Sequence, residues 1–166
     1  MSAPVFAPSL CQVAWVVRDI NASEDFFKKV MGVEKFLQFR NIKARDTKGT
    51  YMGQPADWVI HVSLAYAGDT QIELIQHVSG SSVHQEWIEQ HGDGVQHVAY
   101  WLDDADYEAA VAHMTGAGFP LVQSFTLPMA RIAYFDTRPV IGVVTEIFAA
   151  TAVGYQFRDN MKTGNF

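Results

Sequence analysis

Four side chains that can bind a metal lie at matching places in two similar stretches of the chain. Gln12 precedes Val-Ala-Trp and His97 precedes Val-Ala-Tyr, while Glu73 and Glu146 each lie in an apolar, β-branched run. Because side chains alternate across a strand, each of the four shares its face with apolar neighbours. A buried carboxylate without a partner is unfavourable, so two of them require a cation. A divalent metal bound by one imidazole nitrogen, two carboxylates and one amide oxygen meets that requirement.

Taken one at a time, these residues have ordinary explanations. A histidine on a strand is commonly a hydrogen-bonded core residue, and most glutamates are exposed or paired with a cation. Gln12 alone carries no signal. The repeat changes the interpretation, because Gln12 corresponds to His97 and Glu73 corresponds to Glu146, and a twofold repeat brings corresponding positions to one axis.

The first set of elements follows Gln12 directly. A β-branched and aromatic strand is expected over 12–17, followed by a helix to about Met31 that Gly32 ends. Asn21 and Glu24 have the spacing of a capping box at its start. Further strands are expected over 34–40, 58–66 and 70–76. A long connection over 41–57 begins with a polar loop over 41–50 and turns around Pro55.

The strands over 58–66 and 70–76 are expected to form a hairpin. A hairpin centred at 67–68 places Val62 opposite Glu73, with Ile60 and Leu64 on the same face. Glu73 is therefore expected among apolar side chains, which is unusual for a carboxylate.

The same order of elements is expected a second time after a linker at 79–82 and a short helix. A strand over 95–102 and a helix over 107–117 are followed by strands over 120–124, 131–135 and 142–148. The sequence predicts an α+β fold in which two repeated βαβββ modules form a curved mixed sheet around a central metal cavity. Residues 1–166 form one domain with modules at about 10–78 and about 94–150, a linker helix over 82–91, and a C-terminal tail over 150–166 of unassigned structure. Residues 1–10, with Pro4 and Pro8, are expected to be an extended arm.

The composition narrows the classes of partner. The 166 residues are 49% hydrophobic, 13% aromatic and 18% charged, which is typical of a globular domain with a substantial core. The 12 Lys and Arg against 18 Asp and Glu give a net charge of -6, so neither nucleic acid nor an anionic membrane is expected as a partner. A single cysteine, Cys11, excludes an internal disulfide and a CxxC site, and together with the lack of a visible signal peptide it leads us to expect a cytoplasmic protein.

The chain resembles the vicinal oxygen chelate superfamily, which contains glyoxalase I, methylmalonyl-CoA epimerase, extradiol dioxygenases and fosfomycin or bleomycin resistance proteins. The resemblance extends over 12–148. It rests on Gln12-Val-Ala-Trp, Asp25-Phe-Phe-Lys-Lys-Val-Met-Gly-Val, Thr70-Gln-Ile-Glu-Leu, Gly94-Val-Gln-His-Val-Ala and Val143-Val-Thr-Glu-Ile.

The four candidate ligands resemble the Gln/Glu/His/Glu set of some glyoxalase I enzymes and are close to the epimerase pattern. The resemblance implies a divalent metal (Zn, Ni, Co, Mn or Fe) held by Gln12, Glu73, His97 and Glu146. It also implies an isomerase, epimerase or lyase in which the metal polarises a carbonyl and a carboxylate moves a proton on the adjacent carbon. Glu146 is the first candidate base and Glu73 the second, because a carboxylate in an apolar cavity has a raised pKa that suits this role.

Departures from the relatives restrict the substrate. The pattern of the glutathione-binding members has Arg and Asn at the positions where this chain has Val16 and His77. This difference argues against glutathione as the substrate. The epimerase pattern places a second catalytic glutamate where this chain has Ala56 and Asp57. A hydrophobic or aromatic carbonyl compound, or an acyl-CoA, is therefore expected. Its candidate contacts are Val16, Ile60, Val62, Leu64, His77, Trp101 and Phe148.

Two other functions stay open. A resemblance to the extradiol dioxygenases would imply a His/His/Glu triad that binds iron, and Gln12 and Glu73 do not match that triad. A non-catalytic protein that binds a small molecule such as a drug is the second alternative, although such members generally lack a complete ligand set. The resemblance also implies a homodimer, with the site built within one chain or between two.

Overall fold

One mixed sheet organises the chain, and the computed structural model describes residues 9–166 of it. Within that range the strand order is β2-β5-β6-β1-β7-β10-β9-β8-β3-β4. The strands are β1 (Leu10–Val16), β2 (Leu37–Lys43), β3 (Thr50–Tyr51), β4 (Gln54–Pro55), β5 (Val59–Ala67), β6 (Thr70–Ser79), β7 (Gly94–Asp103), β8 (Leu121–Leu127), β9 (Ala130–Phe135) and β10 (Val144–Ala150). The arm predicted for residues 1–10 lies outside the described residues except for its last two.

The sheet has the same strand arrangement on both sides of its centre. β1 and β7 pair antiparallel, while β1 is parallel to β6 and β7 is parallel to β10. Reading outward, one side continues through β5 to β2 and the other through β9 to β8. The predicted α+β class with a curved mixed sheet is confirmed, and the module boundaries stay a prediction.

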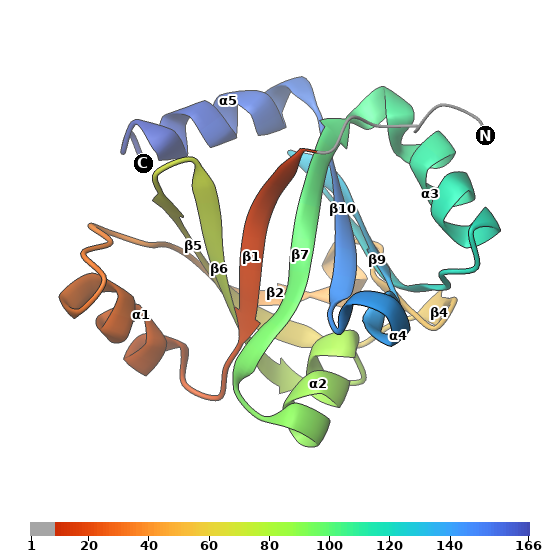
Figure 1. The fold of residues 1–166 in the computed structure, drawn as a ribbon, viewed down its shortest axis with the longest axis horizontal. Coiled ribbons are helices and arrows are strands. Elements are labelled where there is room, and N and C mark those ends of the chain that lie inside the picture. The colour runs from red at the N-terminus through yellow and green to blue at the C-terminus, as the bar shows by residue number, and fades with distance from the viewer. Residues whose placement is uncertain (1–8) are drawn as a thin grey trace.

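Helices cover the outside and the ends of the sheet (Figure 1). α1 (Ile20–Lys29) packs on the outer face with Ile72 and Leu74, and α3 (Tyr107–Gly116) packs there with Phe135 and Ile147. α2 (Val83–His91) and α5 (Ala152–Lys162) lie at opposite ends of the sheet, and α4 (Arg138–Ile141) precedes β10. The remaining apolar core lies inside the curve of the sheet.

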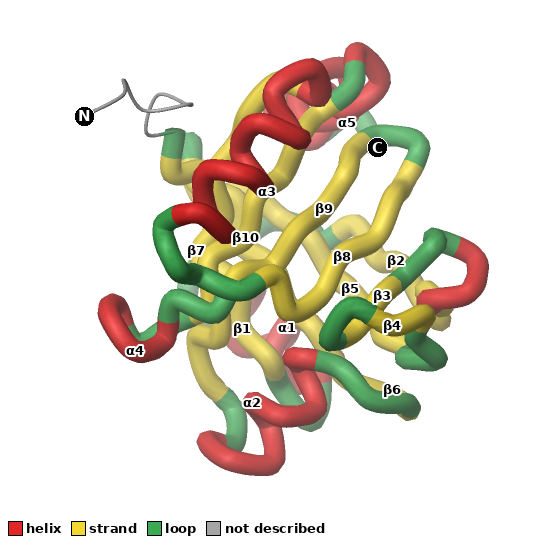
Figure 2. Tube along the Cα trace, turned by 90° about the vertical axis from the view of Figure 1, so that its right-hand side faces the viewer, coloured by secondary structure: helices red, strands yellow, loops and turns green. Residues whose placement is uncertain are grey.

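The chain after β2 crosses to the other side of the molecule, and Figure 2 shows β3 and β4 beside β8. A 3-10 turn, η1 (Ala44–Asp46), leads into this crossing, and a second one, η2 (Asp104–Asp106), precedes α3. The backbone N–H of Thr126 donates to the carbonyl of Thr47 at 2.8 Å, and Thr50 pairs with Ser124. These bonds join the two sides of the curved sheet. The connection expected over 41–57 therefore contains two short strands, β3 and β4.

Several local predictions were wrong. Asp19, not Asn21, caps α1, because its side chain accepts the backbone N–H groups of Asn21 and Ala22. The hairpin turn lies at Gly68-Asp69, so Glu73 pairs with Leu64 instead of Val62. This shift is by two residues, and a two-residue shift leaves every side chain on its predicted face.

The C-terminal tail was the largest omission, since α5 forms a regular helix there. Its cap is Thr151, whose hydroxyl accepts the backbone N–H of Gly154 at 3.3 Å. Within residues 9–166, no helix combines the length and apolarity needed to cross a membrane.

Candidate metal centre

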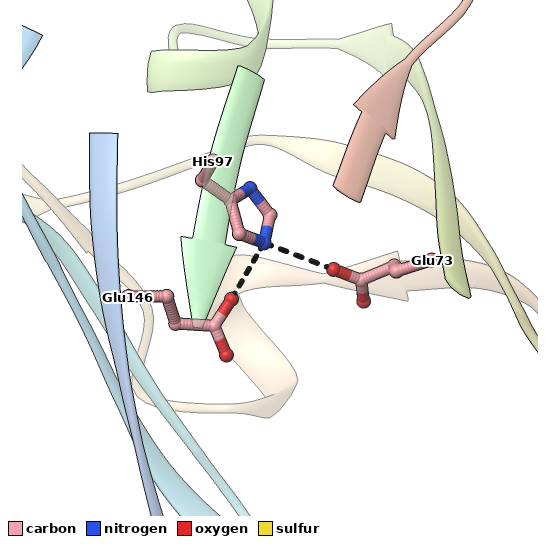
Figure 3. A group of neighbouring side chains, drawn as sticks. All are labelled: Glu73, His97 and Glu146. Carbon is pink, nitrogen blue, oxygen red and sulfur yellow. Dashed lines mark ion pairs between the residues drawn. The ribbon is translucent and has the colours of Figure 1, made fainter. Parts of the chain in front are cut away.

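The four central strands place the candidate ligands at one end of a cavity. Ala14 of β1 pairs with His97 of β7 on one side and with Glu73 of β6 on the other. Glu146 of β10 pairs with Ala99, the residue of β7 two positions beyond His97. Small alanines between the ligands keep the long side chains unobstructed, so His97, Glu73 and Glu146 converge (Figure 3).

His97 lies between the two carboxylates. Its Nε2 is 2.8 Å from Glu146 Oε2 and 3.1 Å from Glu73 Oε2, and the ring is fully buried. One ligand atom from each of the three residues lies within 4.8 Å of the other two. This is the separation that one ion can span when each ligand lies at about 2 to 2.6 Å from it.

The candidate ligand atoms have no hydrogen-bond partners among residues 9–166. His97 Nε2, Glu73 Oε2, Glu146 Oε2 and Gln12 Oε1 are all buried, and the contacts of His97 with the carboxylates lack hydrogen-bond geometry. A buried polar atom without a partner is unfavourable by about 1 to 3 kcal/mol, more if charged. The facing atoms of Glu73, His97 and Glu146 therefore fit a divalent cation, and Gln12 Oε1 is a further buried oxygen without a partner among the described residues.

Neighbouring amides orient two of these ligands. His97 Nδ1 lies 2.6 Å from Gln96 Oε1, and an amide oxygen only accepts, so Nδ1 carries the proton in this contact. In the neutral ring the lone pair of Nε2 then faces the carboxylates, where a bound cation would take the place of the second ring proton. Gln12 Nε2 donates to Gln71 Oε1 at 2.7 Å, which leaves Gln12 Oε1 as its free oxygen.

The charges in this site are strongly coupled. Burial would lower the pKa of His97, but the carboxylates of Glu146 and Glu73 raise it to about 9. Burial raises the pKa of Glu73, and the negative charge of Glu146 adds to the rise while His97 opposes it. Two carboxylates and one imidazole in a dry environment thus share too little positive charge, which a divalent cation would supply.

The carboxylates open onto an apolar cavity of about 130 Å³. Its polar end is lined by Gln12, Gln71, Glu73, Tyr134 and Glu146, and the rest by apolar side chains that include Phe39, Phe125, Ile132 and Phe157. Trp101 and Phe148 stack at 4.6 Å between ring centroids on one wall.

The predicted substrate contacts separate into two groups. Val62, Leu64, Trp101 and Phe148 line the cavity. The other three, Val16, Ile60 and His77, do not line it. Val16 and Ile60 pack in the core with Trp58 and Trp87, and His77 pairs with Ile60 at the same end of the sheet, where α2 fills the space.

Two buried residues beside His97 carried no recognisable sequence signal. Tyr134 pairs with Glu146 across β9 and β10, and its ring centroid lies 5.1 Å from that of His97. Burial, the charges of Glu146 and Glu73, and a hydrogen bond to Glu146 raise the pKa of Tyr134. His84 of α2 contacts the Tyr134 ring at 5.5 Å between centroids, and burial lowers its pKa well below the usual value.

Asp57 accepts the backbone N–H of Ser81 and is not among the residues that line the cavity.

A family model described as the Glyoxalase/Bleomycin resistance protein/Dioxygenase superfamily matches residues 11–134. The match includes Gln12, Glu73 and His97 and extends over more than half of the 166 residues. The chain belongs to this superfamily. The resemblance seen in the sequence is thereby confirmed. This superfamily member carries its candidate ligands on the central strands of the sheet. None of the curated proteins matches it.

Solved structures share the fold of this superfamily member at low sequence identity. A hypothetical protein from Bacillus halodurans has a TM-score of 0.66 and 17% identity, over 88% of this chain and 96% of its own. Methylmalonyl-CoA epimerase from Mycobacterium tuberculosis has a TM-score of 0.62 and 18% identity, over 91% and 96%. A Streptomyces coelicolor methylmalonyl-CoA epimerase variant in complex with 2-nitronate-propionyl-CoA has a TM-score of 0.54 and 18% identity, over 88% and 100%.

Proposed function

We propose that this protein is a metal-dependent isomerase, epimerase or lyase that removes a proton from the carbon next to a carbonyl. The observation that carries the proposal is the buried set of Gln12, Glu73, His97 and Glu146, whose facing atoms lack hydrogen-bond partners within the described chain. Superfamily membership and a fold shared with methylmalonyl-CoA epimerases support the same reaction type.

A bound divalent ion supplies Lewis-acid stabilisation of the negative charge that develops on the substrate oxygen. The carboxylate that moves the proton must lie beside the reacting carbon. Its oxygen takes the proton from the C–H bond, and the electron pair of that bond moves toward the carbonyl oxygen. Delivery of a proton to the other face by the second carboxylate would epimerise the carbon, whereas return of the proton by the first carboxylate to the neighbouring carbon would isomerise an α-hydroxy carbonyl substrate.

Glu146 and Glu73 are the two candidates for this carboxylate. Glu146, which has the shorter contact with His97 and pairs with Tyr134 across β9 and β10, is the first candidate. Glu73 has a pKa raised mainly by burial, which is the property that a general base at neutral pH needs. The apolar walls exclude water and favour the uncharged part of a hydrophobic or aromatic substrate.

Two measurements test the proposal. Elemental analysis of the purified protein, before and after reconstitution with divalent metals, should find one ion per chain. Proton NMR in deuterium oxide should then show metal-dependent loss of the methylene signal of α-hydroxyacetophenone, whose exchangeable protons adjoin an aromatic ketone. At metal concentrations that saturate both proteins, we expect Glu146→Gln to slow this exchange by about 100-fold or more relative to the wild type.

The outcomes separate the alternatives. Failure of every divalent metal to bind would exclude the enzyme proposal and leave a non-catalytic binding protein. Iron accompanied by oxygen consumption would instead favour a dioxygenase. Full exchange by Glu146→Gln with loss of exchange by Glu73→Gln would assign the proton transfer to Glu73.

A further inference from the structure

Helix α5 closes one end of the apolar cavity. Phe157, from the middle of this helix, lines the cavity, and its ring centroid lies 6.3 Å from that of Phe39 on β2. Tyr155 packs edge-on against Trp101 at 5.6 Å between centroids. The helix lies across the strand ends in Figure 1. Its Phe157 lines the same cavity as Glu73 and Glu146.

Both ends of α5 are held in place. At the start of the helix, Thr151 donates its backbone N–H to the carbonyl of Met129 at 3.0 Å. A Cβ on Gly154 would lie 2.2 Å from that same carbonyl oxygen, so only glycine permits this close approach. At the other end, Lys162 Nζ lies 2.8 Å from Asp69 Oδ1 in the β5–β6 turn. With both ends fixed, the helix holds Phe157 at a defined distance from the opposite wall.

The size and charge of the enclosed space restrict what it can hold. Its volume is about 130 Å³, and an apolar cavity of about 150 Å³ accommodates a benzene ring. Among the described residues that line it, none is Lys or Arg, while two are glutamates. An anionic group in this space would therefore meet like charge and no compensating cation from the protein.

We propose that the cavity receives a single uncharged aromatic ring and that Phe157 sets this size limit. The inference deepens the proposed function, on which the choice of a carbonyl compound rests, and it selects a small aromatic ketone or aldehyde over an acyl-CoA. Trp101 and Phe148, which stack on each other, form one aromatic wall of the cavity, and Phe157 is the residue that determines specificity.

Calorimetric titration of the full chain with three probes tests the inference. The probes are acetophenone, which has one ring, 2-acetonaphthone, which has two, and benzoate, an anion of similar size to acetophenone. Titration after treatment with a chelator keeps a metal from binding the carboxylate of benzoate. We expect acetophenone to bind about tenfold or more tightly than either other probe, since misfits of one methylene already change affinity by about tenfold.

Variants of α5 separate the size limit from general damage. Phe157→Ala should improve the binding of 2-acetonaphthone by about tenfold or more, and Phe157→Trp should weaken acetophenone by a similar factor. Val153→Ala, at an exposed position on the same helix, should change neither affinity. Circular dichroism of each variant reports whether the helix is retained, and the opposite effects of Ala and Trp cannot both arise from unfolding.

Two results would overturn the inference. One is an unchanged ratio of the two ketone affinities in both Phe157 variants, and the other is the absence of acetophenone binding to the wild type. Because these titrations use metal-free protein, they succeed or fail independently of metal binding and proton exchange. A protein with the predicted size selectivity but without metal would retain the binding inference and lose the proposed function.

Discussion

Two clusters built around buried glutamates lie on opposite faces of the same sheet. They differ in how many hydrogen bonds the carboxylate oxygens accept. On the outer face, the Glu24 carboxylate of α1 accepts hydrogen bonds from Ser63 at 2.5 Å, from Gln38 at 2.7 and 2.8 Å, and from Lys28 at 3.0 Å. Inside the curve, Glu73 and Glu146 have only His97 between them, and one oxygen of each lacks a hydrogen-bond partner within residues 9–166. A saturated carboxylate has a structural role, whereas the inner pair retains capacity to bind a cation.

The pKa values follow the same division. Burial would raise the pKa of Glu24, but the hydrogen bonds from Ser63, Lys28 and Gln38 outweigh burial and lower it. For Glu73 burial prevails and the pKa is raised. The number of donors around a carboxylate, rather than its burial alone, therefore separates Glu24 from Glu73.

The largest expected effect is loss of metal binding in Glu146→Gln. The substitution removes one charged ligand while retaining the shape of the side chain, so affinity should fall by about 1000-fold, or about 4 kcal/mol. Calorimetric titration with zinc measures this. Glu24→Gln is the matched control and should bind zinc as the wild type does. Equal zinc affinity in Glu146→Gln would contradict the proposed ligand set.

The converse experiment removes the outer carboxylate. Glu24→Ala leaves the buried donors of Ser63 and Gln38 without their acceptor, so the free energy of unfolding should fall by about 3 kcal/mol. Urea denaturation measures this loss on chelator-treated protein. Metal content per chain should stay unchanged, and a loss of metal would show that the two clusters are not independent.

A smaller effect is expected from the residue that orients His97. Gln96→Leu removes the acceptor of the His97 Nδ1 proton, so metal affinity should fall by about 10- to 100-fold. Nitrogen NMR shifts of the His97 ring should report a changed mixture of tautomers. A packing defect alone would not change this mixture. Gln90→Leu, at an exposed position on α2, is the control.

The smallest effect concerns a single donor to Glu24. Ser63→Ala should lower the free energy of unfolding by about 1.5 kcal/mol at neutral pH. Because the folded pKa of Glu24 is lowered, its stabilisation is present above the unfolded pKa and is lost as pH falls through the folded pKa. Losing one donor raises that folded pKa, so denaturation monitored between pH 7 and pH 3 should show acid destabilisation beginning at higher pH than in the wild type. Ser81→Ala, at an exposed position, should show neither change.

The fold class and the candidate ligands could be predicted from the sequence. Alternation along the strands placed Gln12, Glu73, His97 and Glu146 on inward faces. The error in the hairpin register did not change this prediction for Glu73, because a shift of two residues leaves each side chain on the same face. Local pattern also located α2 and α3, since the apolar spacing that predicts each of them is contained within the helix.

The contacts of the buried polar residues could not be predicted from the sequence. Glu24 has the spacing of a capping box, yet donors on β2 and β5 hold it against the sheet. Val16 and Ile60 share the inward face with Leu64, but α2 fills the space beside them and the cavity lies further along the strands. Neither the position of Phe157 above the cavity nor the contact of Gln96 with His97 follows from local periodicity. Such contacts depend on how distant segments pack, which local periodicity does not specify.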